Sequence, residues 1–231
     1  MTLDKLQHLW IERFQIMQEN PKLDAEKLAA PFLSVMPDGY DPAKHRGILL
    51  VGKATGGEWY RSSFEEHRSV AERQKTTQYF IKDAANGGSD HRAFWRFARA
   101  LDEMNSGSST ERFKNLIWSN VAKVGVLSGN PSGQYLNLQA DLAVETLKAE
   151  IDTYKPTLVV FTVENYAYDL LEQVLENYGA GDQDERWVKQ SDISWRPRDK
   201  NAPAFMCTNH PQGKSKQTLT KWIEIAELLI K

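Results

Sequence analysis

Short apolar runs alternate along the chain with longer segments that have the character of helices. The apolar runs cover residues 48–51, 115–121, 157–163 and 204–208. Runs of this length predict strands that are buried on both faces, as in a parallel sheet. Helices are predicted for residues 91–104, 139–154, 166–178 and 216–230. This order predicts a three-layer α/β/α domain with a central four-stranded parallel sheet and right-handed crossovers.

The remaining segments predict smaller features around this sheet. Residues 3–18 have apolar positions at helical spacing, and residues 24–30 predict a short second helix that ends at a proline. The polar stretch 65–78 predicts a helix or a mobile segment, and residues 186–198 have the irregular apolar pattern of an edge hairpin. Because no repeat or linker divides the chain, we expect one domain over residues 1–231, with an N-terminal helical extension up to about residue 45.

Polar residues or glycine follow three of the predicted strands directly. Gly52 follows the first, Asn120 ends the second, and Asn209 and His210 follow the fourth. The carboxyl ends of parallel strands lie at one edge of a sheet, where open α/β sheets bind ligands. Glycine at such an end permits a tight turn and close approach of a ligand. We therefore expect Gly52, Asn120 and His210 to surround one concave site, although a plain strand-to-loop turn explains the glycine equally well.

Composition limits the chemistry at this site. The chain has 231 residues, a formal net charge of -2 and a pI of about 6.2, so any basic surface for nucleic acid must be local. The single cysteine, Cys207, excludes an iron–sulfur cluster held by four cysteines and a cysteine-rich zinc site. We expect no metal and no cofactor. No segment approaches the ~20 apolar residues that span a bilayer, so we expect a cytoplasmic protein without membrane contact. We also expect a monomer.

The three strand-end motifs, in this order, resemble those of the uracil-DNA glycosylase superfamily. They are Val51-Gly-Lys-Ala-Thr-Gly56, Ile117-Trp-Ser-Asn120-Val-Ala-Lys123 and Asn209-His-Pro-Gln212. The resemblance extends from about residue 47 to the C-terminus, but the first 45 residues or so and residues 59–90 do not follow it clearly. It implies the glycosylase fold and hydrolysis of the N-glycosidic bond of a damaged or deaminated base, as in DNA repair.

The resemblance also implies roles for the residues of these motifs. Asn120 would read the Watson–Crick edge of a base turned out of the strand, and His210 would donate to a carbonyl oxygen that gains negative charge. The alternatives are a strand-end cap for Asn120 and a backbone hydrogen bond for His210. The other candidates for contact with the base are Gly52, Ala54, Trp59, Tyr60 and Asn209, of which the two aromatic residues serve equally well in simple packing.

The first motif departs from the family pattern. Where many members have a carboxylate or an amide that positions water, this chain has Lys53 and Ala54, and Thr55 replaces the usual proline. Lys53 is an ammonium donor and cannot accept a proton from water. Glu58 is near enough in sequence to act as the base, or it is a solvated surface acid. The candidates for catalysis are therefore His210, Glu58 and Lys53.

The expected partner is DNA, single-stranded or duplex, or a ligand that contains a nucleobase. Candidate contacts to the nucleic-acid backbone are Arg61, Lys123, Gln212, Lys214 and Lys216, and Arg196 adds a further cation before the last motif. The alternative function is a non-catalytic binder of nucleic acid or nucleotide that keeps the glycosylase pocket. A third possibility is an unrelated α/β enzyme whose glycine turn at Gly52 holds a phosphate.

Overall fold

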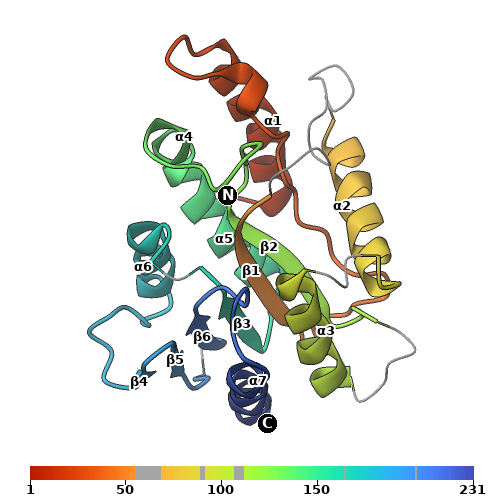
Figure 1. The fold of residues 1–231 in the computed structure, drawn as a ribbon, viewed down its shortest axis with the longest axis vertical. Helices are drawn as coiled ribbons and strands as arrows, with labels where there is room; N and C mark the ends of the chain where they lie inside the picture. The colour runs from red at the N-terminus through yellow and green to blue at the C-terminus, as the bar shows by residue number, and fades with distance from the viewer. Residues whose placement is uncertain (56–68, 89–91, 107–111, 164, 201) are drawn as a thin grey trace.

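One sheet forms the centre of the protein. The computed structural model describes residues 1–55, 69–88, 92–106, 112–163, 165–200 and 202–231, and within them the sheet has six strands in the order β2-β1-β3-β6-β5-β4 (Figure 1). The parallel strands are β1 (Ile48–Ala54), β2 (Leu116–Ala122), β3 (Leu158–Phe161) and β6 (Ala204–Thr208). The hairpin of β4 (Val188–Gln190) and β5 (Ile193–Arg196) is antiparallel to them.

The α/β class and the four parallel strands agree with the prediction, but a sheet of only four strands is wrong. The hairpin predicted for residues 186–198 joins the sheet, because β5 pairs with β6 from Ile193 to Arg196. All three residues of β4 are exposed, and only Ile193 and Arg196 of β5 are buried. A hairpin with so few buried apolar positions carries little sign in its sequence that it continues a sheet.

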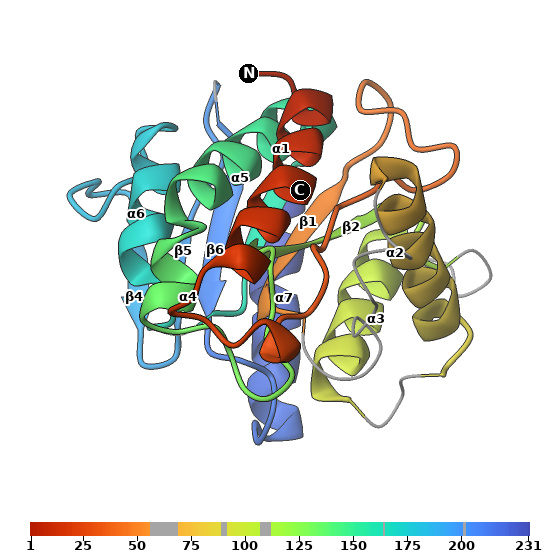
Figure 2. The same ribbon diagram turned by 90° about the horizontal axis from the view of Figure 1, so that it is seen from above.

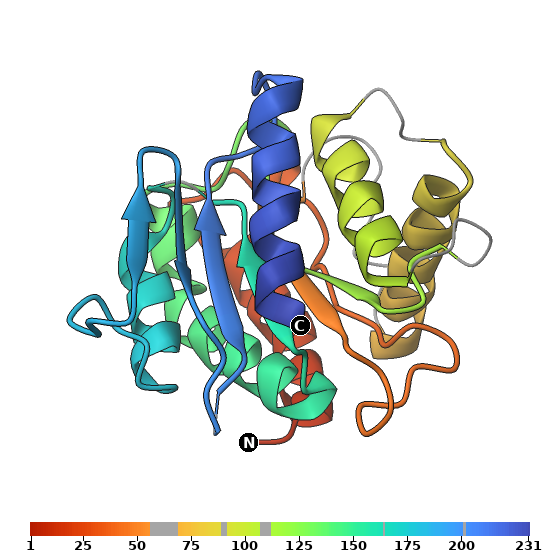
Figure 3. The same ribbon diagram turned by 90° about the horizontal axis from the view of Figure 1, so that it is seen from below.

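Helices cover both faces of the sheet. Leu49 and Val51 pack on the face covered by α1 (Leu3–Glu19), α5 (Ala140–Tyr154) and α6 (Tyr168–Glu176) (Figure 2). Ile48 and Leu50 pack on the opposite face, which is covered by α2 (Val70–Ala85), α3 (Ala93–Ser106) and α7 (Lys216–Ile230) (Figure 3). Because successive side chains of a strand point to opposite faces, burial of both sets explains the continuous apolar run of β1.

The segment after α1 corrects one prediction. A helix over residues 24–30 is wrong, since only a single 3-10 turn forms at Ala25–Lys27. Beyond it the chain runs beside the end of β2: the amide of Ala29 donates to the carbonyl of Gly125 and that of Phe32 to the carbonyl of Lys123. These long-range backbone hydrogen bonds outweigh the local helical propensity. The described loop before α5 contains the short helix α4 (Gln134–Asn137).

The start of α2 has a clear local signal, and a side chain of α3 fixes the segment before β2. Ser69 and Glu72 form a capping box at the start of α2, each side chain accepting from the backbone amide of the other. The carboxylate of Asp102 in α3 accepts a hydrogen bond from the backbone amide of Phe113 at 2.7 Å. Phe113 has a positive φ of 63°. None of the described helices has both the length and the apolar character needed to cross a membrane.

Asp102 gives the stability of the protein a predictable dependence on pH. Burial raises the pKa of its carboxyl from 3.8 to about 6, so the folded state holds this proton more tightly than the unfolded state. The stabilisation is complete below pH ~4 and is lost as the pH rises through ~6. We expect the stability of Asp102→Asn relative to the wild type to increase by about 1 to 2 kcal/mol between pH 4 and pH 7. Urea unfolding at both pH values measures this, and a pH-independent difference would contradict it.

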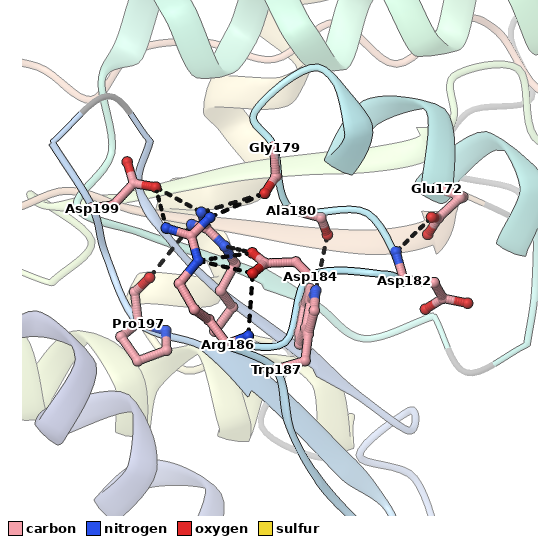
Figure 4. A network of polar contacts seen from close by, with 10 residues as sticks. Glu172, Gly179, Ala180, Asp182, Asp184, Arg186, Trp187, Pro197 and Asp199 are labelled. Atoms are coloured by element: carbon pink, nitrogen blue, oxygen red, sulfur yellow. Dashed lines mark hydrogen bonds and ion pairs between the residues drawn. The ribbon is translucent and has the colours of Figure 1, made fainter.

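A network of charged side chains joins β5 to the loops before and after the hairpin (Figure 4). Arg196 is fully buried, and its guanidinium donates to Asp184 at 2.5 Å and to Asp199 at 2.6 Å. Arg186 donates to the same two carboxylates, and both arginines hold the pKa of Asp184 well below its usual range. The expectation that Arg196 adds a cation for nucleic acid is therefore wrong, because its charge is neutralised inside the protein.

Candidate functional site

A cavity of about 710 Å³ lies at the carboxyl ends of β1 and β2. Its described lining comes from these two strands and Thr55 after β1, from Phe80 of α2, the start of α3, the loop after β6 and the loop that holds Gly129 and Asn130. Gly52, Asn120 and His210 all line it, so the three strand-end residues converge on one site as predicted. The volume lies within the range of about 300 to 1,000 Å³ that is usual for ligand sites.

Asn120 and Gly52 form the floor of the cavity. They are directly opposite each other in the β1–β2 register. A Cβ atom at Gly52 would lie 2.7 Å from Oδ1 of Asn120 and 3.3 Å from a ring carbon of Phe94, so glycine makes room for both side chains. Asn120 is only 2% exposed, and its Nδ2 has no hydrogen-bond partner within the described structure. A buried, unpaired donor is costly unless a ligand satisfies it.

Aromatic rings form one wall of the cavity, and none of them was among the site residues predicted from the sequence. Trp118, Phe94 and Trp95 line the site, with the ring centroids of Trp118 4.9 Å from Trp95 and 6.3 Å from Phe94. One signal was present in the sequence: Trp118 is two residues before Asn120 on the same strand, and positions two apart point to the same face. Such a wall offers flat apolar surfaces to a planar ligand.

His210 faces this wall from the loop after β6. Its ring lies nearly parallel to that of Phe94, with the centroids 6.4 Å apart. The backbone amide of Gln212 donates to Nδ1 of His210 at 3.2 Å. A neutral imidazole whose Nδ1 accepts carries its proton on Nε2, so His210 has an N–H group on Nε2 in its neutral form.

The charged residues of the lining all have the same sign. Lys53, Arg92 and Arg96 line the cavity, and none of its described lining residues is an aspartate or a glutamate. The pocket therefore favours a ligand that carries negative charge or several acceptor atoms. No group of three or more histidine, cysteine, aspartate or glutamate side chains in the described ranges is placed to hold a metal ion.

The structure separates most of the predicted site residues into four groups. The predicted residues that line the cavity are Gly52, Lys53, Ala54, Asn120, His210 and Gln212. Asn209 instead lines a second hollow of about 310 Å³ between α6 and the hairpin, together with Cys207 and Thr208 of β6. Lys214 and Lys216 are outside the described lining, before and at the start of α7. Glu58, Trp59, Tyr60 and Arg61 lie outside the described residues.

Lys123 is not at the surface, and its predicted contact with a nucleic-acid backbone is wrong. Its side chain is buried, and Nζ donates to Glu150 and to Ser119, each at 2.6 Å. Ser34 donates to the same carboxylate at 2.6 Å and pairs with the hydroxyl of Tyr154 at 2.9 Å. The pKa of Lys123 is lowered, because the effect of burial exceeds the opposing effect of the Glu150 carboxylate. This network anchors the residue before Asn120 to α5 instead of contacting a ligand.

Comparisons with known proteins give no assignment. No model of a protein family matches the chain, and no curated protein matches it. A proposal for the function therefore depends on the cavity and on the residues that line it.

Proposed function

We propose that the cavity binds a nucleobase turned out of a nucleic-acid strand, in a uracil-DNA glycosylase-like protein that hydrolyses the N-glycosidic bond of a damaged or deaminated base. The unpaired Nδ2 of Asn120 inside the cavity carries this proposal. A side-chain amide has a donor and an acceptor side by side, which complements the carbonyl and ring N–H on the edge of an oxo-base. The ring of Phe94 next to Gly52 offers a face on which such a base can stack.

The proposed reaction assigns the developing charge to His210. When the bond between base and sugar breaks, electrons move onto the base and its carbonyl oxygen becomes negative. A neutral imidazole with its proton on Nε2 stabilises that oxygen by donating a hydrogen bond. Water then attacks C1′ of the oxocarbenium-like sugar, and its proton passes to a base, for which Glu58 is the candidate from the sequence. The products are the free base and an abasic sugar.

Replacing Asn120 tests the proposed base contact. We expect Asn120→Ala to weaken binding of uracil-containing single-stranded DNA by about 5- to 150-fold, the loss of one buried hydrogen bond worth about 1 to 3 kcal/mol. The thermal stability of the protein should not fall, because Nδ2 makes no hydrogen bond within the described structure. Fluorescence anisotropy and differential scanning calorimetry measure the two quantities.

Asn209→Ala is the matched control for this experiment. It removes the same side chain from the adjacent hollow, outside the lining of the main cavity, and should leave DNA binding unchanged. The same design with DNA that contains hypoxanthine or xanthine covers the other oxo-bases. If Asn120→Ala and Asn209→Ala bind every DNA as the wild type does, the base is not read at this cavity.

A non-catalytic binder of nucleic acid or nucleotide is the second candidate. It is favoured by Lys53 and Ala54 in the first motif and by the lack of a carboxylate in the described lining. The two candidates differ in product, because only a glycosylase leaves abasic sites that alkali cleaves. Incubation with DNA carrying uracil, hypoxanthine or xanthine distinguishes them. In a glycosylase with Glu58 as the base, Glu58→Gln lowers the rate by about 10²- to 10⁴-fold.

A further inference from the structure

The N-terminal turn of α3 opens into the cavity. Ala93, Phe94, Trp95 and Arg96 form this turn, and Arg92 precedes it; all five line the cavity. The first amide groups of a helix have no acceptor inside the helix, and the helix dipole gives this end a partial positive charge. Both effects favour an anion, above all a phosphate.

Two guanidinium groups strengthen this preference. Arg92 and Arg96 are both exposed and are four residues apart, which is about one helical turn. A guanidinium presents a planar set of donors that matches two oxygens of a phosphate. The first turn of α3 has no acidic residue, and none of the described lining residues is an aspartate or a glutamate, so the charged side chains of the described lining are all cationic.

A separate observation points to a ligand in the same cavity. The amide of Asn120 is 98% buried and has an unpaired donor, and the hydroxyl of Thr55, also in the lining, is buried without a partner in the described structure. Phe94 belongs to the first turn of α3, and its ring lies next to Gly52. It therefore connects the helix turn with the region around Asn120. Groups that recognise a base and groups that recognise an anion therefore share one cavity.

The second hollow has the opposite character. Glu172, Asp182 and Asp192 line it, with Lys189 as the single cation among its described residues. Such a surface repels a phosphate. An anionic ligand therefore distinguishes between the two hollows and favours the one at β1, β2 and α3.

Building on the proposed function, we propose that the cavity binds a complete nucleotide, with its phosphate held by Arg92, Arg96 and the first turn of α3 and its base at Asn120. The phosphate belongs either to a free mononucleotide or to the strand that carries the base. In both cases the recognised group is a phosphate attached to the nucleoside in the pocket. Oxygens of the phosphate accept hydrogen bonds from the two guanidinium groups. The Watson–Crick edge of the base pairs with the side-chain amide of Asn120.

The test compares ligands with and without phosphate. Isothermal titration calorimetry measures uridine, uridine 5′-monophosphate, inosine and inosine 5′-monophosphate on the wild type, on Arg92→Gln/Arg96→Gln and on Lys22→Gln/Lys155→Gln. The two lysines are exposed and outside the described lining, so the control loses the same charge elsewhere. We expect the phosphate to tighten binding about 10-fold or more in the wild type and the control, and to give little gain in the arginine variant.

A short single-stranded oligonucleotide of deoxyuridine identifies the source of the phosphate. If only the oligonucleotide loses affinity in Arg92→Gln/Arg96→Gln, the phosphate belongs to the strand. The slope of log affinity against log salt should then become shallower by about 0.7 for each lost phosphate contact. If a free monophosphate loses affinity as well, the site accepts a mononucleotide.

The outcomes separate this inference from the proposed function. Equal affinities for all phosphate-bearing ligands in the arginine variant and the wild type would overturn the phosphate site. The base site would stand in that case if Asn120→Ala still weakened uridine or inosine binding. If the wild type bound none of the nucleosides, nucleotides or oligonucleotides, both proposals would be wrong.

Discussion

Lys123→Met is expected to lower the free energy of unfolding by about 3 to 5 kcal/mol, the usual cost of removing one partner from a buried ion pair. Lys123 and Glu150 are both fully buried, and their charged atoms are 2.6 Å apart. Without the ammonium, the carboxylate stays in the interior with only hydroxyl donors from Ser34 and Ser119. Urea unfolding followed by circular dichroism measures the loss.

Two controls show whether the cost comes from the unpaired charge. Lys123→Met/Glu150→Gln removes both charges and keeps an acceptor for the hydroxyl groups, so it should recover about half of the loss or more. Lys27→Met breaks an exposed ion pair with Asp24 at 2.9 Å and should cost far less than Lys123→Met, because solvent screens the pair. Equal losses in Lys123→Met and Lys27→Met would contradict the buried network.

The strands of the parallel sheet could be predicted because their signal is local. Residues buried on both faces leave a continuous apolar run, and the four runs coincide with β1, β2, β3 and β6. The same reasoning placed Gly52, Asn120 and His210 at one edge, since parallel strands bring their carboxyl ends together. The cavity at this edge agrees with that expectation.

The features that sequence reasoning missed depend on partners far along the chain. A lysine directly after a strand has the sequence character of a surface cation, and Lys123 is buried only because Glu150 of α5 meets it. Arg196 likewise depends on Asp184 and Asp199. The contribution of α3 to the cavity depends on how this helix packs against β2, which no local pattern specifies.

His210→Ala is expected to slow base release by about 10²- to 10³-fold if the protein is a glycosylase, the usual cost of removing one donor to a developing oxyanion. Binding of the intact DNA should change little, because the carbonyl oxygen becomes negative only as the bond breaks. The rate is measured by alkaline strand cleavage at abasic sites in single turnovers, with DNA that carries uracil, hypoxanthine or xanthine.

The adjacent residue provides the control for His210. Asn209→Ala alters the same loop but lines the hollow next to α6, so its rate should equal that of the wild type. A similar loss in both variants would show that the loop as a whole, and not the imidazole, sets the rate. If His210→Ala released base at the wild-type rate, the oxygen would be stabilised by another group. Lys53 would then be a candidate, because it lines the same cavity and an ammonium can donate a hydrogen bond to a carbonyl oxygen.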